Sequence, residues 1–104
     1  MKLIVDIDGT ICSNTHGDYE RAAPFRERIL HLNGLLDSGH EIHYWTARGS
    51  ATGKDWSELT RRQLEEWGVR YSSLRLGKPS YDLWIDDKAS HADTFFEQIS
   101  AAPS

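Results

Sequence analysis

The chain has 104 residues, of which 38 % are hydrophobic and 27 % are charged, and its formal net charge is −4. This length and composition predict one soluble globular domain over residues 1–104, and the acidic balance argues against a nucleic-acid partner. The single Cys12 cannot form an internal disulfide, and no apolar stretch is long enough to span a membrane. We therefore expect a cytoplasmic protein that binds neither nucleic acid nor membrane.

The first half of the chain predicts two strands that flank a helix. Lys2–Val5 is a short apolar run typical of a strand buried on both faces, and a polar loop follows over residues 11–23. Apolar side chains at helical spacing predict a helix that starts near Pro24 and ends at Gly39. Glu41–Trp45 then predicts the second strand.

The second half predicts two more strands and two more helices. They are, in chain order, a helix capped by Asp55 and Glu58 and ended by Gly68, a strand over Val69–Leu76, a short strand over Leu83–Ile85, a helix from about Lys88 to Ile99, and a flexible tail over about 101–104. This alternation predicts an α/β fold: a Rossmann-like three-layer sandwich with a mainly parallel sheet and helices on both faces. In such sheets ligands bind beyond the carboxyl ends of the strands.

Two carboxylates follow the first strand directly. Asp6 and Asp8 are two residues apart, so their side chains lean the same way in extended backbone. Two like charges this close repel, so one carboxylate must be protonated, bound to a cation or transiently esterified. Asp86 and Asp87 follow the last predicted strand, and oxygen ligands from the two acidic pairs predict a Mg²⁺ site.

Further polar groups follow the other strands. Thr46 ends the second strand and Lys78 follows the third, so a hydroxyl and an ammonium are expected at the same edge of the sheet. Together with a cation they suit a phosphoryl group, whose charge is spread over several oxygens. We expect Ala47 and Arg48 to contact the substrate as well, with a solvent-facing salt bridge as the alternative for Arg48. Asp87 is either a metal ligand or the N-cap of the last helix.

In this order the motifs resemble the signature of the haloacid dehalogenase (HAD) superfamily of phosphatases. The resemblance spans nearly the whole chain and implies a HAD-like core without a cap domain, because the loops 11–23 and 49–54 are too short to hold one. A finer resemblance, to short phosphatases of bacterial capsule and surface-polysaccharide synthesis, implies a sugar phosphate as substrate. The motifs are Asp6-Ile7-Asp8-Gly9-Thr10, Thr46, Lys78-Pro79 and Asp86-Asp87.

The resemblance also implies a role for each matching residue. Asp6 is the nucleophile that forms an aspartyl-phosphate, and Asp8 protonates the leaving oxygen and then activates water. The other implied roles are a hydrogen bond to the phosphoryl group from Thr46, neutralisation of its charge by Lys78, and Mg²⁺ coordination by Asp6, the carbonyl of Asp8, Asp86 and Asp87.

The expected function is therefore Mg²⁺-dependent hydrolysis of a small phosphorylated metabolite through an aspartyl-phosphate. A phosphotransferase or phosphomutase that uses the same intermediate is the alternative. A phospho-acceptor signalling module is a third, less favoured alternative, because there the phosphorylated Asp ends a central strand, which here ends in Thr46. The open rim suggests a large substrate, a substrate that brings its own cover, or a second subunit of a homo-oligomer that acts as a lid.

Overall fold

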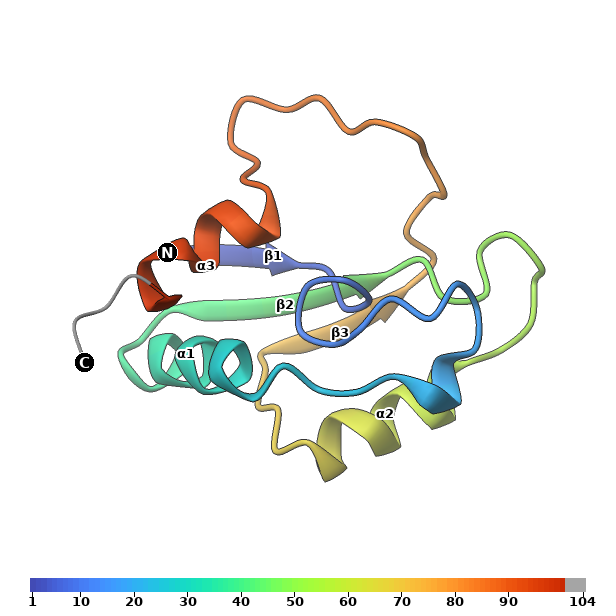
Figure 1. Cartoon of the computed structure of the whole chain (residues 1–104), viewed down its shortest axis with the longest axis horizontal. Coiled ribbons are helices and arrows are strands. Elements are labelled where there is room, and N and C mark those ends of the chain that lie inside the picture. Colours follow the sequence, from blue (N-terminus) through green and yellow to red (C-terminus); the bar gives the residue numbers. More distant parts are fainter. Residues whose placement is uncertain (101–104) are drawn as a thin grey trace.

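Strands and helices alternate along the chain as the sequence predicts. The computed structural model describes residues 1–100, with side chains through Glu97 (Figure 1). The sheet has three parallel strands in the order β1-β2-β3. The elements are β1 (Lys2–Val5), a 3₁₀ turn (Tyr19–Arg21), α1 (Arg26–Asp37), β2 (Glu41–Thr46), α2 (Ser57–Glu66), β3 (Ser73–Leu76) and α3 (Ala92–Ser100).

The register of the sheet brings the carboxyl ends of all three strands to one edge. Val5, the last residue of β1, pairs with Tyr44 of β2, and Thr46, the last residue of β2, pairs with Leu76 of β3. One further backbone hydrogen bond, from the Lys78 N–H to the Thr46 carbonyl (3.0 Å), extends the contact beyond β3. The residues that follow the strands are therefore neighbours.

The core lies between the helices and one face of the sheet. Alternate residues of β2 point to opposite faces, so Ile42 and Tyr44 are buried while His43 and Trp45 are only partly covered. On the less covered face Ile4 is 60 % exposed. The sequence predicts helices on both faces of the sheet, but within residues 1–100 one face remains partly exposed. The buried cluster comprises Val5, Ile7, Ile11, Cys12, Ile29, Leu32, Ile42, Tyr44, Leu64, Trp67, Val69 and Phe96.

The strand predicted over Leu83–Ile85 is wrong for this structure. It falls within residues 77–91, which hold no helix or strand, and Figure 1 shows this segment arching away from the sheet. Leu83 is 75 % and Ile85 is 87 % exposed. A strand of three apolar residues between acidic ones would form few hydrogen bonds with a neighbouring strand. Among residues 1–100 the sheet therefore ends at β1, which pairs with β2 alone.

Two element boundaries also differ from the sequence prediction. The third strand begins at Ser73 rather than Val69, because the buried Asn33 side chain accepts the Arg70 N–H (3.0 Å) and holds that stretch beside α1. The last helix begins at Ala92 rather than near Lys88.

The C-terminal end is described in part. The predicted tail 101–104 and the side chain of Ile99 lie outside the described residues, whereas Phe96 of α3 is described and is buried. Through residue 100, no helix combines the length and the apolar character that crossing a bilayer requires.

Candidate functional site

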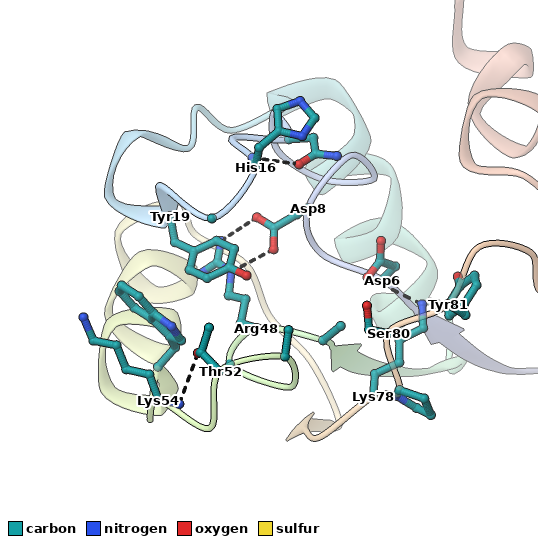
Figure 2. A pocket seen from close by; sticks show the side chains of 17 residues that line it. Asp6, Asp8, His16, Tyr19, Arg48, Thr52, Lys54, Lys78, Ser80 and Tyr81 are labelled. Atoms are coloured by element: carbon teal, nitrogen blue, oxygen red, sulfur yellow. Dashed lines mark hydrogen bonds and ion pairs between the residues drawn. The ribbon is translucent and has the colours of Figure 1, made fainter.

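A pocket of about 660 Å³ lies beyond the carboxyl ends of β1 and β2 (Figure 2). Its walls carry the carboxylates of Asp6 and Asp8 and the cations of Arg48, Lys54 and Lys78. With histidine neutral, the pocket is locally cationic although the chain as a whole is acidic. Such a site favours an anionic ligand.

The turn after β1 directs both carboxylates to this edge. Ile7 is fully buried and anchors the chain between Asp6 and Asp8. Gly9 then turns the backbone with φ of +83°, a conformation that an L side chain rarely adopts, and its N–H donates to the Cys12 carbonyl (2.8 Å). The Asp-x-Asp-Gly pattern is thus a compact turn pinned by its own apolar middle residue.

Asp6 faces Lys78 across the floor of the pocket. The Lys78 Nζ lies 3.6 Å from Asp6 Oδ1, and the Thr10 hydroxyl donates a long hydrogen bond (3.4 Å) to Oδ2. Burial raises the pKa of Asp6, and the Lys78 ammonium offsets only part of this effect. A partly desolvated carboxylate beside one cation is a more reactive nucleophile than a fully hydrated one.

Asp8 is bound by Arg48 through both carboxylate oxygens. The Arg48 Nε donates to Oδ2 and Nη2 donates to Oδ1, each at 2.9 Å. The Arg48 side chain is fully buried, and its Nη1 donates to Thr60 and Gln63 of α2 at 3.1 and 2.6 Å. The salt bridge considered for Arg48 therefore exists, but it is buried instead of facing solvent. The sequence alone does not predict this pairing across 40 residues.

Thr46, at the end of β2, is buried, whereas Ala47, which follows it, faces the pocket. Thr46 is buried, and its hydroxyl oxygen accepts the Arg48 N–H (3.1 Å), so it does not line the pocket wall. Its hydroxyl hydrogen remains available as a donor. Ala47 lines the wall, as expected for a substrate contact.

Lys78 is held by its backbone as well as by its side chain. Its N–H donates to the Thr46 carbonyl, and its carbonyl accepts the Ser50 hydroxyl (2.7 Å). Its Nζ lies 5.2 and 5.7 Å from the ring centres of Tyr81 and Trp84. These contacts hold the Lys78 ammonium next to Asp6, although Lys78 lies outside the sheet, two residues after the end of β3.

Asp86 and Asp87 lie outside the pocket, on the exposed 77–91 segment. The Lys88 N–H donates to Asp86 Oδ1 (2.9 Å), and this hydrogen bond is the largest cause of the lowered pKa of Asp86. The N-cap alternative for Asp87 is wrong, because α3 begins at Ala92 and the His91 ring accepts the Asp93 N–H there (3.1 Å).

The Mg²⁺ ligands that the resemblance implies are therefore not assembled. Through residue 100, no three His, Cys, Asp or Glu side chains are grouped so that they could hold one metal ion. Asp6 offers a suitable carboxylate in the pocket, whereas Asp86 and Asp87 lie outside it on the exposed 77–91 segment. The residues as arranged do not fit the ion.

The pocket also includes residues whose proximity only the fold shows. Trp56 lies just before α2 and lines the pocket, whereas Trp67, at the end of the same helix, is buried in the core. The Trp56 ring meets the edge of Tyr19 at 5.0 Å, and the Lys54 Nζ lies 4.3 Å from its centre. Figure 2 shows Tyr19 and Lys54 on the side of the pocket opposite Lys78.

Comparison with known proteins supports the fold. No family model and no curated protein matches the chain. A crystal structure of a structural-genomics target from Vibrio cholerae is similar, with a TM-score of 0.82 and 29 % sequence identity over 96 % of this chain and 94 % of that one. The two proteins therefore share the small α/β architecture with its parallel sheet and flanking helices.

Proposed function

We propose that this chain is a HAD-type phosphatase that hydrolyses a phosphate monoester in this pocket, with Asp6 as the nucleophile. One observation carries the proposal: the Asp6 carboxylate and the Lys78 ammonium face each other at 3.6 Å on the floor of a cationic pocket. A phosphoryl group placed there meets an attacking oxygen and a cation together. The resemblance of the motifs to the HAD signature is independent support.

The proposed reaction has two steps. In the first, Asp8 receives a proton from the bound ester monoanion, an Asp6 oxygen attacks phosphorus, the bond to the leaving oxygen breaks, and that oxygen takes the proton from Asp8. In the second, Asp8 takes a proton from water, whose oxygen attacks phosphorus and releases inorganic phosphate and free Asp6. Asp8 Oδ2 accepts one hydrogen bond, from Arg48, and keeps another lone-pair site for the proton, whereas Oδ1 accepts from both Arg48 and the Cys12 thiol. Lys78 stabilises the charge on the phosphoryl oxygens in both steps.

The opposite wall suits a hydroxylated ring attached to the phosphate. It combines the aromatic rings of Tyr19 and Trp56 with polar side chains of Asn14, His16 and Thr52. Aromatic faces cover the apolar side of a sugar ring, while amide and hydroxyl groups bind its hydroxyls. This composition supports a sugar phosphate over a small linear phosphate ester.

We further propose that Mg²⁺ is required and that the 77–91 segment completes its site. Within residues 1–100 the outer edge of β1 has no partner strand, and Leu83 and Ile85 are exposed apolar residues. Pairing Leu83–Ile85 with that edge in parallel would bury these side chains and bring Asp86 and Asp87 to the edge where Asp6 lies. No step of the reaction above depends on the ion.

The proposed activity is tested with Asp6→Asn and an aryl phosphate in the presence of Mg²⁺. We expect turnover to be lost while the far-UV spectrum is unchanged, and wild-type protein trapped during turnover to carry one phosphoryl group on the Asp6 peptide. Asp18→Asn is the matched control, because Asp18 is exposed, lies outside the pocket and forms an ion pair with the exposed Arg21. Undiminished turnover by Asp6→Asn would refute the proposal.

The products distinguish the alternatives considered from the sequence. Release of inorganic phosphate indicates a hydrolase, and transfer to an added sugar indicates a phosphotransferase. A phosphorylated Asp6 that persists without turnover indicates an acceptor module.

The metal proposal has a test that does not use activity. Hydrogen exchange with and without Mg²⁺ should show new protection at residues 83–87 and along β1 in wild type, and none in Asp86→Asn. The control is Asp82→Asn, an exposed acid on the same segment. Equal exchange with and without Mg²⁺ in wild type would refute this part alone.

A further inference from the structure

Protein partners occupy four of the five N–H donors of the Arg48 guanidinium. Four of its hydrogen bonds run to side-chain oxygens, two to Asp8 and one each to Thr60 and Gln63. An arginine has five N–H donors in a fixed fork, so at most one is left for a ligand. The ring of Tyr19 covers one face of the guanidinium, with its centre 4.7 Å from Cζ.

The buried charge of Arg48 is balanced by Asp8. Asp8 is its only ion-pair partner through Glu97, and the side chain has no exposed surface. The Cys12 thiol, 3.5 Å from Asp8 Oδ1, is neutral because burial and the nearby Asp8 charge raise its pKa to about 12. A phosphoryl group could accept two parallel hydrogen bonds from Arg48 only by displacing Asp8 and leaving that carboxylate without its partner.

Gln63 links this pair to the loop on the other side of the pocket. Its Oε1 accepts from Arg48, and its Nε2 donates to the Tyr19 carbonyl at 2.6 Å. The same residue thus connects Asp8, helix α2 and the segment that carries Tyr19. In Figure 2 the Tyr19 ring lies over the Arg48 side chain, in agreement with the 4.7 Å between its centre and Cζ.

We propose that Arg48 is a positioning residue that holds Asp8 from α2, and that it does not bind the phosphoryl group. The proposal rests on the proposed function in one respect, namely that Asp8 exchanges the protons of the reaction. A lysine could supply the charge but not two parallel hydrogen bonds to one carboxylate, so the geometry requires arginine. The phosphoryl group then has Lys78 as its nearest cation.

The first experiment tests the pairing without using activity. Unfolding midpoints in urea are measured for Asp8→Asn, Arg48→Met and the double variant. Each single change leaves one buried partner unmatched, so we expect the double variant to lose clearly less than the two single losses together. Arg62→Met on the exposed side of α2 is the control and should shift the midpoint little. Additive losses would overturn the proposed pairing.

The second experiment separates positioning from phosphate binding. For Arg48→Lys we expect kcat for aryl phosphates to fall roughly 10²-fold, since a displaced catalytic group costs that much. The KM and the dissociation constant for inorganic phosphate should change less than about 2-fold, because the contacts that bind the phosphoryl group in the ground state are unchanged. The loss in kcat should grow as the leaving group becomes more basic and depends more on a donated proton.

The opposite pattern would overturn the proposal. An unchanged kcat together with weakened binding of inorganic phosphate would mean that Arg48 contacts the phosphoryl group. If the wild-type protein turns over no phosphate ester, the proposed function fails, while the urea cycle and the phosphate titration still decide whether Arg48 serves Asp8 or the ligand.

Discussion

Gly49 is the position where the loop beside the pocket tolerates no side chain. A Cβ placed on Gly49 would lie 2.1 Å from the Lys54 carbonyl oxygen and 3.2 Å from Trp56 Cδ1. Its backbone has φ of +82°, and its carbonyl accepts the Gly53 N–H at 2.7 Å, which closes the 49–54 loop. This tight closure places Lys54 and Trp56 in the wall of the pocket.

Gly53 provides a matched control within the same loop. Its φ is +75°, but a Cβ there would meet nothing within 4 Å. Gly53→Ala therefore has only the backbone cost of the left-handed conformation, about 1–2 kcal/mol. Gly49→Ala adds a clash with a backbone carbonyl, which cannot rotate away as a side chain could, and we expect a total loss of about 2–5 kcal/mol.

Urea unfolding of the two variants measures the difference directly. Gly49→Ala should unfold at a clearly lower urea concentration than Gly53→Ala, and its Gly53 amide should exchange faster because the loop-closing hydrogen bond is lost. It should also have the weaker phosphatase activity, since the wall that carries Trp56 is displaced. Equal unfolding midpoints for the two variants would refute the reasoning from the close approach.

Three further outcomes are expected. Asn33→Ala should lower the free energy of unfolding in urea by about 2–3 kcal/mol, because the Gly68 carbonyl and the Arg70 N–H lose their hydrogen bonds to this side chain. Asn33→Asp keeps the acceptor for the Arg70 N–H and should lose less. Burial raises the pKa of the Asp6 carboxyl above its ordinary value of 3.8. The stabilisation of the folded state by protonated Asp6 is therefore complete below pH 3.8 and is lost as the pH rises through the raised pKa. Asp6→Asn should therefore unfold at a higher temperature than wild type at pH 7, and a difference that persisted unchanged to pH 3 would contradict this. Arg28→Met should return the pKa of Asp93, which Arg28 lowers, toward its ordinary value in an NMR titration, and an unchanged pKa would show that the link between α1 and α3 does not form in solution.

Part of the candidate site follows from local sequence patterns. An apolar run followed by Asp6 and Asp8 predicts a strand end, and the parallel arrangement brings Lys78 to the same edge. The structure places Asp6 and Lys78 3.6 Å apart, as this rule predicts. The rule needs only the order of the elements, which apolar spacing and the terminating glycines Gly39 and Gly68 make visible in the sequence.

The partner of Asp8 does not follow from any local pattern. Arg48 directly follows Thr46 and Ala47 and is indistinguishable in the sequence from a substrate-binding arginine. Only the packing of α2 against the end of the sheet makes its environment buried and supplies the oxygens of Thr60 and Gln63. A charge in such a place must be paired, and Asp8 is the carboxylate within reach.

The amino-acid sequence by itself determined the α/β class, the first two strands, the ends of the first two helices before Gly39 and Gly68, and the acidic turn after β1, because each depends on neighbours within a few residues. Tertiary structure decided which wall faces the Asp6–Lys78 pair, where Arg48 is directed and that Leu83–Ile85 lies outside the sheet. Those features depend on whether a distant segment supplies a partner, a buried surface or a hydrogen-bond acceptor. Short strands and buried charges are governed by such long-range contacts more than by their own composition.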